Sequence, residues 1–375
     1  MKVEHFEMER MQSQWENRVR HNLSESGVHP MRLHELLEPA EHEAVLQQRL
    51  GYPQSNGTEE LRAAIASLYP GAGSDNVVVT TGTAEANFIS MWHLLEPGDE
   101  AVLMLPNYMQ IWGIARGLSA EVVPFRLREA DRWRPDFREL RQALSPRTRL
   151  IAVCNPNNPT GAILTDDEMR ELAGLANRHG VWLLADEVYR GAERDGRETP
   201  SFWGLHDRVI ITCGLSKAYG LPGLRLGWVV APPETAAELW ARKDYLTIGP
   251  AILSEWLARR ALQPERRFRI LERTRGILRA NFPVLEAWAA GHEDQLRLVP
   301  PRAGAIAFMR YAWPVNSTEL VVRLRDEQSV LIVPGDHFGM DGLLRIGFGN
   351  ERHDLEAGLS RIDTVFASLP PGRLP

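Results

Sequence analysis

Short apolar segments alternate with amphipathic segments of helical period through the middle of this chain. A typical amphipathic segment is 166–179 (DDEMRELAGLANRH), where apolar residues recur every three or four positions. Strands that alternate with helices in this way run parallel in one sheet, and the helices cover both of its faces. The sequence therefore predicts an α/β fold with a mostly parallel seven-stranded sheet, whose strands are 77–80, 101–105, 122–125, 150–155, 182–186, 209–213 and 226–231.

The pattern changes near residue 250. Long helical segments at 252–262 and 266–290 precede short apolar runs (LRLVP, AIAFMRY, SVLIVPG and LLRIGFG), and a last helix is expected at 353–369. This order is typical of a smaller α+β domain with a largely antiparallel sheet. Before the first strand, the chain has a helical piece at 6–20 and the loop NLSESGVHP. We expect three parts: an N-terminal arm and part of the small domain (1–50), a large domain (51–255) and a small C-terminal domain (256–375).

Charge and composition narrow the function classes. Lysine plus arginine total 43 against 49 acidic residues, a net charge of −6, which argues against a nucleic-acid partner recognised by bulk charge. No apolar run approaches the ~18 residues that a membrane helix needs, and the charged first 20 residues do not resemble a signal peptide. Cys154 and Cys213 lie in separate apolar runs, as expected for reduced core residues of a cytoplasmic protein.

Lysine is scarce in this chain: Lys2, Lys217 and Lys243 are the only three. Arginine can replace lysine on a surface, but its guanidinium stays protonated and cannot act as a nucleophilic amine. Lys217 follows an apolar strand, at the carboxyl end of a parallel sheet, where ligands bind. A partly desolvated lysine in that position can form a Schiff base with an aldehyde. The alternative interpretation is an ordinary lysine in a surface loop.

Three further motifs follow predicted strands. Asp186 ends the strand WLLAD, where a buried carboxylate needs a cation such as a protonated pyridine nitrogen, unless it caps a following helix. Asn158, in NPNNPTG, could donate to a phenolate-type oxygen or could belong to an ordinary turn. The small residues at 82–84 could let backbone N–H groups and a helix N-terminus face a phosphate, or could simply form a tight turn.

Two arginines have comparable alternatives. Arg225 lies eight positions after Lys217, where its guanidinium could reach the same phosphate or could remain on the surface. Arg345 lies inside the apolar strand LLRIGFG and therefore needs a partner. That partner could be a substrate α-carboxylate or the acidic side of a buried salt bridge.

Together these motifs resemble the fold type I PLP-dependent enzymes, specifically the class I and II aminotransferase family. The matching segments span nearly the whole chain in the family's order: YPQSNGTEELRAAIA, TTGTAEAN, LPNYMQIWG, NPNNPTG, ADEVY, GLSKAYGLPGLRLGW and LRIGFG. The combination of NPNNPTG, DEVY and SKxxGxxGxRxG is highly specific. The implied fold is a large domain with the mostly parallel sheet and a smaller α+β domain.

The resemblance implies pyridoxal 5′-phosphate (PLP) as cofactor, bound as a Schiff base to Lys217, and no metal. Asp186 would pair with the pyridine nitrogen, and Tyr108 would stack on the ring. The other implied cofactor contacts are Gly82, Thr83, Ala84, Asn158, Tyr189, Ser216, Arg225 and, from the other subunit of a homodimer, Tyr52. The implied substrate contacts are Arg345, Gly27 and Asn158, and the candidates for side-chain selectivity are Trp15, His29, Tyr245 and Phe348.

The resemblance predicts an aminotransferase for an L-α-amino acid and a 2-oxo acid, with Lys217 as general base. The N-terminal segment and LSKAYGLPGLRLGW are also similar to a subgroup that includes capreomycidine synthase. Enzymes of such biosynthetic pathways run β-elimination, cyclisation or oxidative deamination, and the residues named above serve these reactions too. A PLP-binding regulator would need an additional DNA-binding domain, and a purely structural protein would leave Lys217, Asp186 and Arg345 unexplained.

Overall fold

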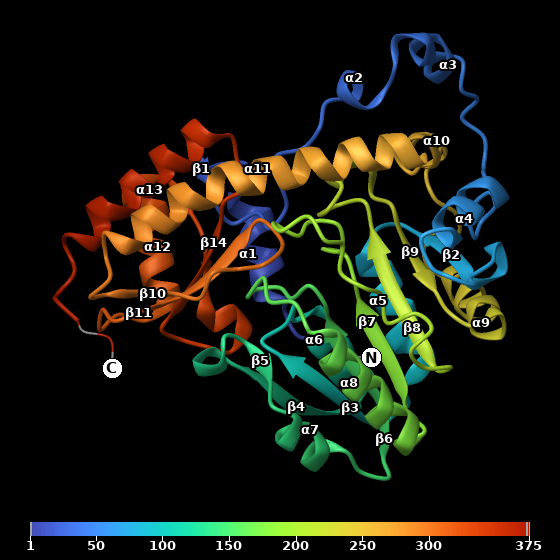
Figure 1. Cartoon of the computed structure of the whole chain (residues 1–375), viewed down its shortest axis with the longest axis horizontal. Helices are drawn as coiled ribbons and strands as arrows, with labels where there is room; N and C mark the ends of the chain where they lie inside the picture. The colour runs from blue at the N-terminus through green and yellow to red at the C-terminus, as the bar shows by residue number, and fades with distance from the viewer. Residues whose placement is uncertain (1, 373, 375) are drawn as a thin grey trace.

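The computed structural model describes residues 2–372 and residue 374, and its centre is a mostly parallel eight-stranded sheet (Figure 1). The strand order is β2-β9-β8-β7-β6-β3-β4-β5, with β9 and β5 antiparallel to their neighbours. The strands are β2 (Val77–Thr80), β3 (Glu100–Leu105), β4 (Glu121–Arg128), β5 (Arg134–Pro135), β6 (Thr148–Cys154), β7 (Trp182–Asp186), β8 (Val209–Gly214) and β9 (Gly227–Val230).

All seven predicted strands are present, and the predicted strand number is wrong by one. The eighth strand, β5, has two residues and contains a proline, so it lacks the apolar pattern that marks the others. It pairs only with β4 at the sheet edge, which is the position that a proline tolerates.

Helices cover both faces of this sheet, because successive side chains of its buried strands point in opposite directions. In β6, Leu150 and Ala152 belong to the core that includes side chains of α5, α6 and α9, whereas Ile151 and Val153 belong to the core that includes α4, α8 and α11. The helices of these two layers are α4 (Glu59–Ala66), α5 (Thr83–Leu94), α6 (Gln110–Gly117), α7 (Phe137–Ala143), α8 (Asp166–His179), α9 (Pro233–Lys243), α10 (Ile252–Ala261) and α11 (Pro264–Ala290).

The C-terminal part contains the predicted antiparallel sheet, in the order β10-β11-β14-β13. Figure 1 shows helix α11, which has 27 residues, running from the large sheet across to this smaller antiparallel sheet. The elements after α11 are β10 (Leu296–Leu298), β11 (Ile306–Tyr311), α12 (Ser317–Gln328), β12 (Val330–Leu331), β13 (Val333–Pro334), β14 (Leu343–Gly347) and α13 (Arg352–Phe366).

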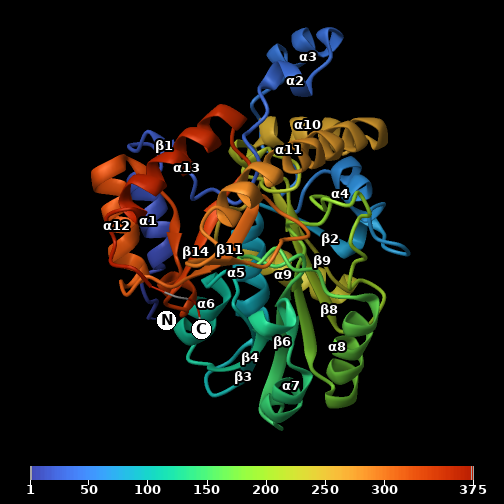
Figure 2. The ribbon, with the colours of Figure 1, turned by 60° about the vertical axis from the view of Figure 1, so that its left-hand side comes forward.

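The N-terminal segment contacts both parts of the chain. Helix α1 (Glu7–Trp15) is shorter than the predicted 6–20 helix, and β1 (His21–Asn22) pairs in parallel with β12. Figures 1 and 2 show α2 (Leu33–Leu36) and α3 (His42–Leu46) projecting away from the body of the molecule. The predicted division at residues 50 and 255 stays a prediction. None of the helices in the described residues has the length and apolar character needed to cross a bilayer.

Candidate active site

A cavity of about 590 Å³ lies at the carboxyl ends of β6, β7 and β8, where β14 and α1 also reach it. It collects most of the site residues predicted from sequence. Those that line it are Thr83, Ala84, Tyr108, Asn158, Asp186, Tyr189, Ser216, Lys217, Arg225 and Arg345. These residues are up to 262 positions apart in the chain, and the fold brings them together in one cavity.

One end of the cavity is built to receive an anion. Gly82 has φ of +81°, and a Cβ there would lie 2.4 Å from Nη2 of Arg225, so only glycine lets the two approach. Helix α5 begins at Thr83, whose buried hydroxyl has no hydrogen-bond partner. Arg225 donates to Ser216 Oγ at 3.3 Å and to Pro222 O at 3.0 Å, which are both uncharged. A phosphate group would satisfy the hydroxyl, the guanidinium and the helix N-terminus together.

Asp186 presents a fixed carboxylate deeper in the cavity. Its side chain is buried, and its oxygens accept hydrogen bonds from Asn87 Nδ2 at 3.1 Å and from the Val188 N–H at 3.0 Å. Burial raises the pKa of Asp186 to about 6, and these two neutral donors offset only part of that rise. A cationic ring nitrogen would supply the missing charge. The helix-cap alternative is wrong, because no helix begins between β7 and β8.

Lys217 follows β8, and its ammonium group faces a carboxylate that was not predicted. The Nζ atom lies 2.5 Å from Oε1 of Glu25, in the loop before Gly27. Burial by itself lowers the pKa of Lys217, but Glu25 and Tyr189 raise it above its ordinary value. Tyr189 donates its hydroxyl hydrogen to Ser26 Oγ at 2.8 Å, and burial raises the pKa of this tyrosine to about 12.

Arg345 projects from β14 into the same cavity with only 1% of its surface exposed. Its Nη1 donates to Asn158 Oδ1 at 2.9 Å and its Nη2 to Ser24 O at 2.6 Å, while Nε has no partner. Within the described residues no carboxylate lies within ion-pair distance of Arg345, so the buried salt bridge is not formed. The guanidinium therefore has the charge and the geometry to bind a carboxylate.

Two predicted contacts take positions set by the N-terminal segment. Tyr108 donates its hydroxyl hydrogen to Glu9 Oε1 at 2.9 Å, and the ring of Phe6 packs edge-on against it. Gly27 lies beside the lysine, because a Cβ there would be 3.5 Å from Lys217 Cδ. Tyr52 is 96% exposed and lies outside this cavity, so its role in a neighbouring subunit stays a prediction.

The four candidates for side-chain selectivity lie outside this cavity of the single chain. Trp15, His29, Tyr245 and Phe348 do not line the cavity: Phe348 is buried against Phe282, and Tyr245 is 84% exposed. The wall opposite the sheet comes instead from α1 and the loop after β1, through Met8, Glu9, Gln12, Glu16, Glu25 and Ser26. The loop NLSESGVHP is visible in the sequence, but Gly27 is its only residue that was predicted to contact the substrate.

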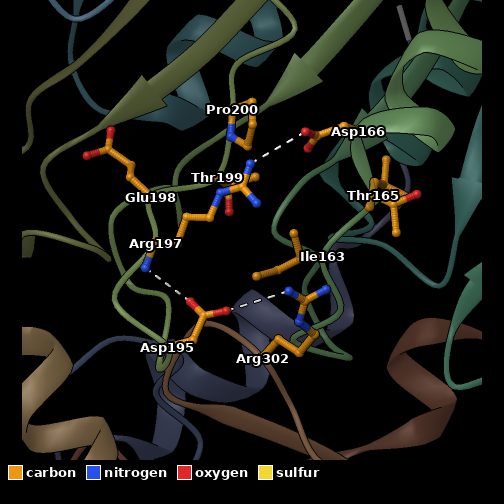
Figure 3. Close-up of a pocket in the computed structure, with 10 residues that line it drawn as sticks. Ile163, Thr165, Asp166, Asp195, Arg197, Glu198, Thr199, Pro200 and Arg302 are labelled. Carbon is orange, nitrogen blue, oxygen red and sulfur yellow. Dashed lines mark hydrogen bonds and ion pairs between the residues drawn. The ribbon is translucent and has the colours of Figure 1, made fainter.

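A second cavity, of about 270 Å³, lies near the start of α8 (Figure 3). Its charged side chains all have ion-pair partners: Arg197 with Asp166 at 3.4 Å, Arg302 with Asp195 at 3.6 Å, and Glu198 with Arg190 and Arg267 outside the lining. This pairing leaves no unpaired charge among them for a ligand. Among the described residues, no group of three or more potential metal ligands occurs.

Comparisons with known proteins place the chain in a family and identify similar solved structures. Residues 22–362 match the family model for aminotransferase class I and II. Capreomycidine synthase of Streptomyces vinaceus is 36% identical over 358 residues, 94% of this chain and 91% of that protein. A PLP-dependent aminotransferase from Streptococcus suis 89-1591 has a TM-score of 0.92 at 30% identity, with 100% of both chains covered. The PLP-dependent cyclase OrfR has a TM-score of 0.88 at 27% identity, with 98% of both chains covered.

Proposed function

Because the chain belongs to the class I and II aminotransferase family, we propose that it transfers the amino group of an L-α-amino acid to a 2-oxo acid. The family, the fold type I architecture and the PLP cofactor predicted from the sequence are confirmed. The observation that carries the proposal is the meeting of Lys217, Asp186 and Arg345 in one cavity, which supplies an amine, an anion and a carboxylate-binding group.

The cavity offers a partner for each polar part of the cofactor. We assign the phosphate to the Gly82 turn, the Thr83 hydroxyl, Ser216 and Arg225, because these groups converge without an acidic partner. Asp186 would keep the ring nitrogen protonated, and Asn158 and Tyr189 would contact the ring oxygen. When bound, PLP supplies a ring that accepts the electron pair of the substrate's α-carbon.

The protein's own groups then position the substrate and move its proton. Arg345 would hold the substrate carboxylate, since its Nε is buried without a partner. Lys217 would be the base that removes the α-proton of the substrate and the acid that returns it, because its Nζ lies in the same cavity as Asp186 and Arg345. Helix α1 covers one side of this space through Glu9, whose carboxylate accepts the hydroxyl hydrogen of Tyr108.

The second candidate is a non-transaminating reaction: β-elimination, cyclisation or oxidative deamination of an amino-acid conjugate in a biosynthetic pathway. Two observations favour it. One is the 36% identity to a protein named a synthase, and the other is the likeness to a PLP-dependent cyclase. The residues of the cavity support both candidates, because both begin with removal of the α-proton.

Stoichiometry distinguishes the two candidates. An aminotransferase given an amino acid alone should convert its cofactor once to the amino form and stop until a 2-oxo acid is added. We would follow the cofactor absorbance and the products by mass spectrometry over a panel of amino acids. Many turnovers without an acceptor, with release of ammonia and no amino form of the cofactor, would overturn the first candidate and support the second.

The proposed assembly is a homodimer in which Tyr52 reaches the phosphate in the other subunit. Exposed apolar side chains support this proposal: Leu50 is 78%, Tyr52 96% and Ile248 56% exposed. The two segments that carry them meet, because a Cβ at Gly249 would lie 3.7 Å from Ser55 Cα. An exposed apolar surface of this kind is typical of an interface between subunits.

A further inference from the structure

The loop that carries Glu25 is clamped to the end of β14 and the segment after it. The Gly347 N–H donates to Leu23 O at 2.7 Å, and the His29 N–H donates to Gly349 O at 2.7 Å. A Cβ at Gly347 would lie 2.1 Å from Glu25 O, and one at Gly349 would lie 2.3 Å from Gly27 O. Because two glycines let the loop approach this closely, the backbone of Glu25 is fixed relative to the cavity.

The side chain of Glu25 is fixed as well. Its Oε1 accepts the N–H of Ser26 at 2.8 Å and that of Gly27 at 3.0 Å, within its own turn. The same oxygen lies 2.5 Å from Nζ of Lys217. The carboxylate is therefore oriented by its own loop and presented to the lysine, as expected of a built ion pair rather than a chance surface contact.

Three other titratable groups also lie near the Lys217 nitrogen, each from a different part of the chain. Tyr189 follows β7, Arg345 belongs to β14, and Glu16 follows α1. Burial and Arg345 oppose a positive charge on Lys217, whereas Tyr189 favours it. Among the described residues, the side-chain hydrogen bond of Lys217 goes to Glu25, so Glu25 is the group in direct contact.

We propose that Glu25 is the counter-ion of the Lys217 nitrogen and stabilises its protonated form, both in the apoprotein and when the nitrogen is linked to PLP. This inference rests on the proposed function only in taking Lys217 as the cofactor-bearing residue. A protonated nitrogen makes the cofactor carbon bonded to it more open to attack by the substrate amine. The same anion stabilises the proton that Lys217 takes from the substrate, because the resulting ammonium again faces Glu25.

The pKa of Glu25 agrees with this role. Burial alone would raise it, but Lys217 and the two backbone N–H groups outweigh burial and hold it at about 2. Glu25 thus stays ionised over the whole range in which the enzyme would be assayed. It acts through Lys217 and is a positioning residue, not the proton acceptor itself.

The test is a pH titration of the visible absorbance of the holoenzyme, which reports the protonation of the Lys217 nitrogen without turnover. The variant is Glu25→Gln, which keeps an oxygen for the two backbone N–H groups and removes the charge. The matched control is Glu16→Gln, a carboxylate of the same cavity wall that makes no hydrogen bond to Lys217. We expect the midpoint to fall by about one pH unit or more in Glu25→Gln and to stay nearly unchanged in Glu16→Gln.

A second measurement, made on the apoprotein, tests the inference even if Glu25→Gln binds PLP too poorly for the absorbance titration. In apoprotein, competitive acetylation followed by peptide mapping gives the pKa of Lys217 directly, and near-UV circular dichroism checks the fold. We expect Lys217 to react at lower pH in Glu25→Gln than in wild type, and Glu25→Asp to restore most of the difference. Equal midpoints and equal labelling profiles in wild type and Glu25→Gln would overturn the inference. A colourless wild-type protein whose Lys217 still responds to Glu25 would instead count against the proposed function.

Discussion

Asn87 donates from Nδ2 to Oδ2 of Asp186 at 3.1 Å and accepts the Thr212 hydroxyl hydrogen on Oδ1 at 2.7 Å. Helix α5 is thereby tied to β7 and β8 through one buried amide, because Thr212 lies directly opposite Asp186 in the sheet. Both ends of the amide are used, so the side chain cannot rotate without losing a buried hydrogen bond. The orientation of the Asp186 carboxylate is thus set before any ligand binds.

The replacement Asp186→Asn should raise the stability of the apoprotein at pH 8 and lower the turnover of the holoenzyme. In apoprotein the folded-state pKa of Asp186, about 6, exceeds its ordinary value of 3.8, so the folded state binds this proton more tightly than the unfolded state. The stabilising contribution is present below the ordinary pKa and is lost as pH rises through about 6. We therefore expect apo Asp186→Asn to be more stable than wild type at pH 8 by about 1 kcal/mol or more, with little difference near pH 4.

Urea unfolding of both apoproteins at the two pH values measures that difference. The same variant should lose turnover by about two orders of magnitude or more, because the ring nitrogen loses its anion. Near-normal turnover combined with a normal cofactor spectrum would contradict the role given to Asp186.

Lys217 should be the single lysine that carries PLP. Lys243 is fully buried in a structural role, with Nζ 2.9 Å from Ser55 O and 2.5 Å from Ile248 O, so its amine is not available. Borohydride reduction of the holoenzyme followed by peptide mapping should label Lys217. Lys217→Ala should retain PLP through the phosphate contacts and lose turnover by about three orders of magnitude or more. A label on Lys243 would refute this assignment.

Gly82→Ala should weaken PLP binding, because the new methyl group would occupy the space of the Arg225 guanidinium, 2.4 Å away. Gly71→Ala is a matched control: Gly71 has a similar φ of +78°, but a Cβ there meets nothing within 4 Å. Gly71→Ala controls for the positive φ, whereas Gly82, with ψ of 164°, lies in a region that essentially only glycine adopts, so backbone strain of roughly 1–3 kcal/mol adds to the clash in Gly82→Ala. Equilibrium dialysis should show about tenfold or greater loss of PLP affinity only for Gly82→Ala. Equal losses in the two variants would attribute the effect to strain alone.

Arg345→Met should raise the KM for amino acids about a hundredfold or more, because the substrate carboxylate would lose its guanidinium. Amines that lack a carboxylate should be processed no worse than by wild type. Arg352→Met serves as the control, since Arg352 lies on the exposed side of α13 and pairs with Glu356 at 2.8 Å. An unchanged KM in Arg345→Met would leave this arginine with a structural role only.

Sequence reasoning found the residues whose role follows from their place at a strand end. Asp186 ends one apolar strand, and Lys217 lies shortly after another. Both were predictable because burying a charged group there costs free energy unless another group pairs with it. Asn87 was missed because its role depends on a residue 99 positions away, and a polar residue in a helix is otherwise unremarkable. Glu25 was missed for the same reason, since 192 positions separate it from Lys217.

Local pattern could not decide between alternatives that only tertiary contacts distinguish. Arg345 was equally compatible with a buried salt bridge, until its hydrogen bonds to Asn158 and Ser24 identified neutral partners. The part that α1 plays in the cavity wall was not predicted, because its path is set by packing such as Phe6 against Tyr108. No periodicity in the first 20 residues encodes that path.

Subunit complementation tests the proposed place of Tyr52. Tyr52 is 96% exposed and lies outside its own chain's cavity, so its phenol is free to serve a neighbouring subunit. We would refold an equal mixture of two variants, Tyr52→Ala and Lys217→Ala, each of which we expect to have little activity alone at limiting PLP. If Tyr52 acts across the interface, each heterodimer has one complete site, formed by the lysine of one chain and the tyrosine of the other. Random pairing then restores about a quarter of wild-type activity. If Tyr52 acts within its own chain, neither site of a heterodimer is complete, and the mixture should be no more active than its components.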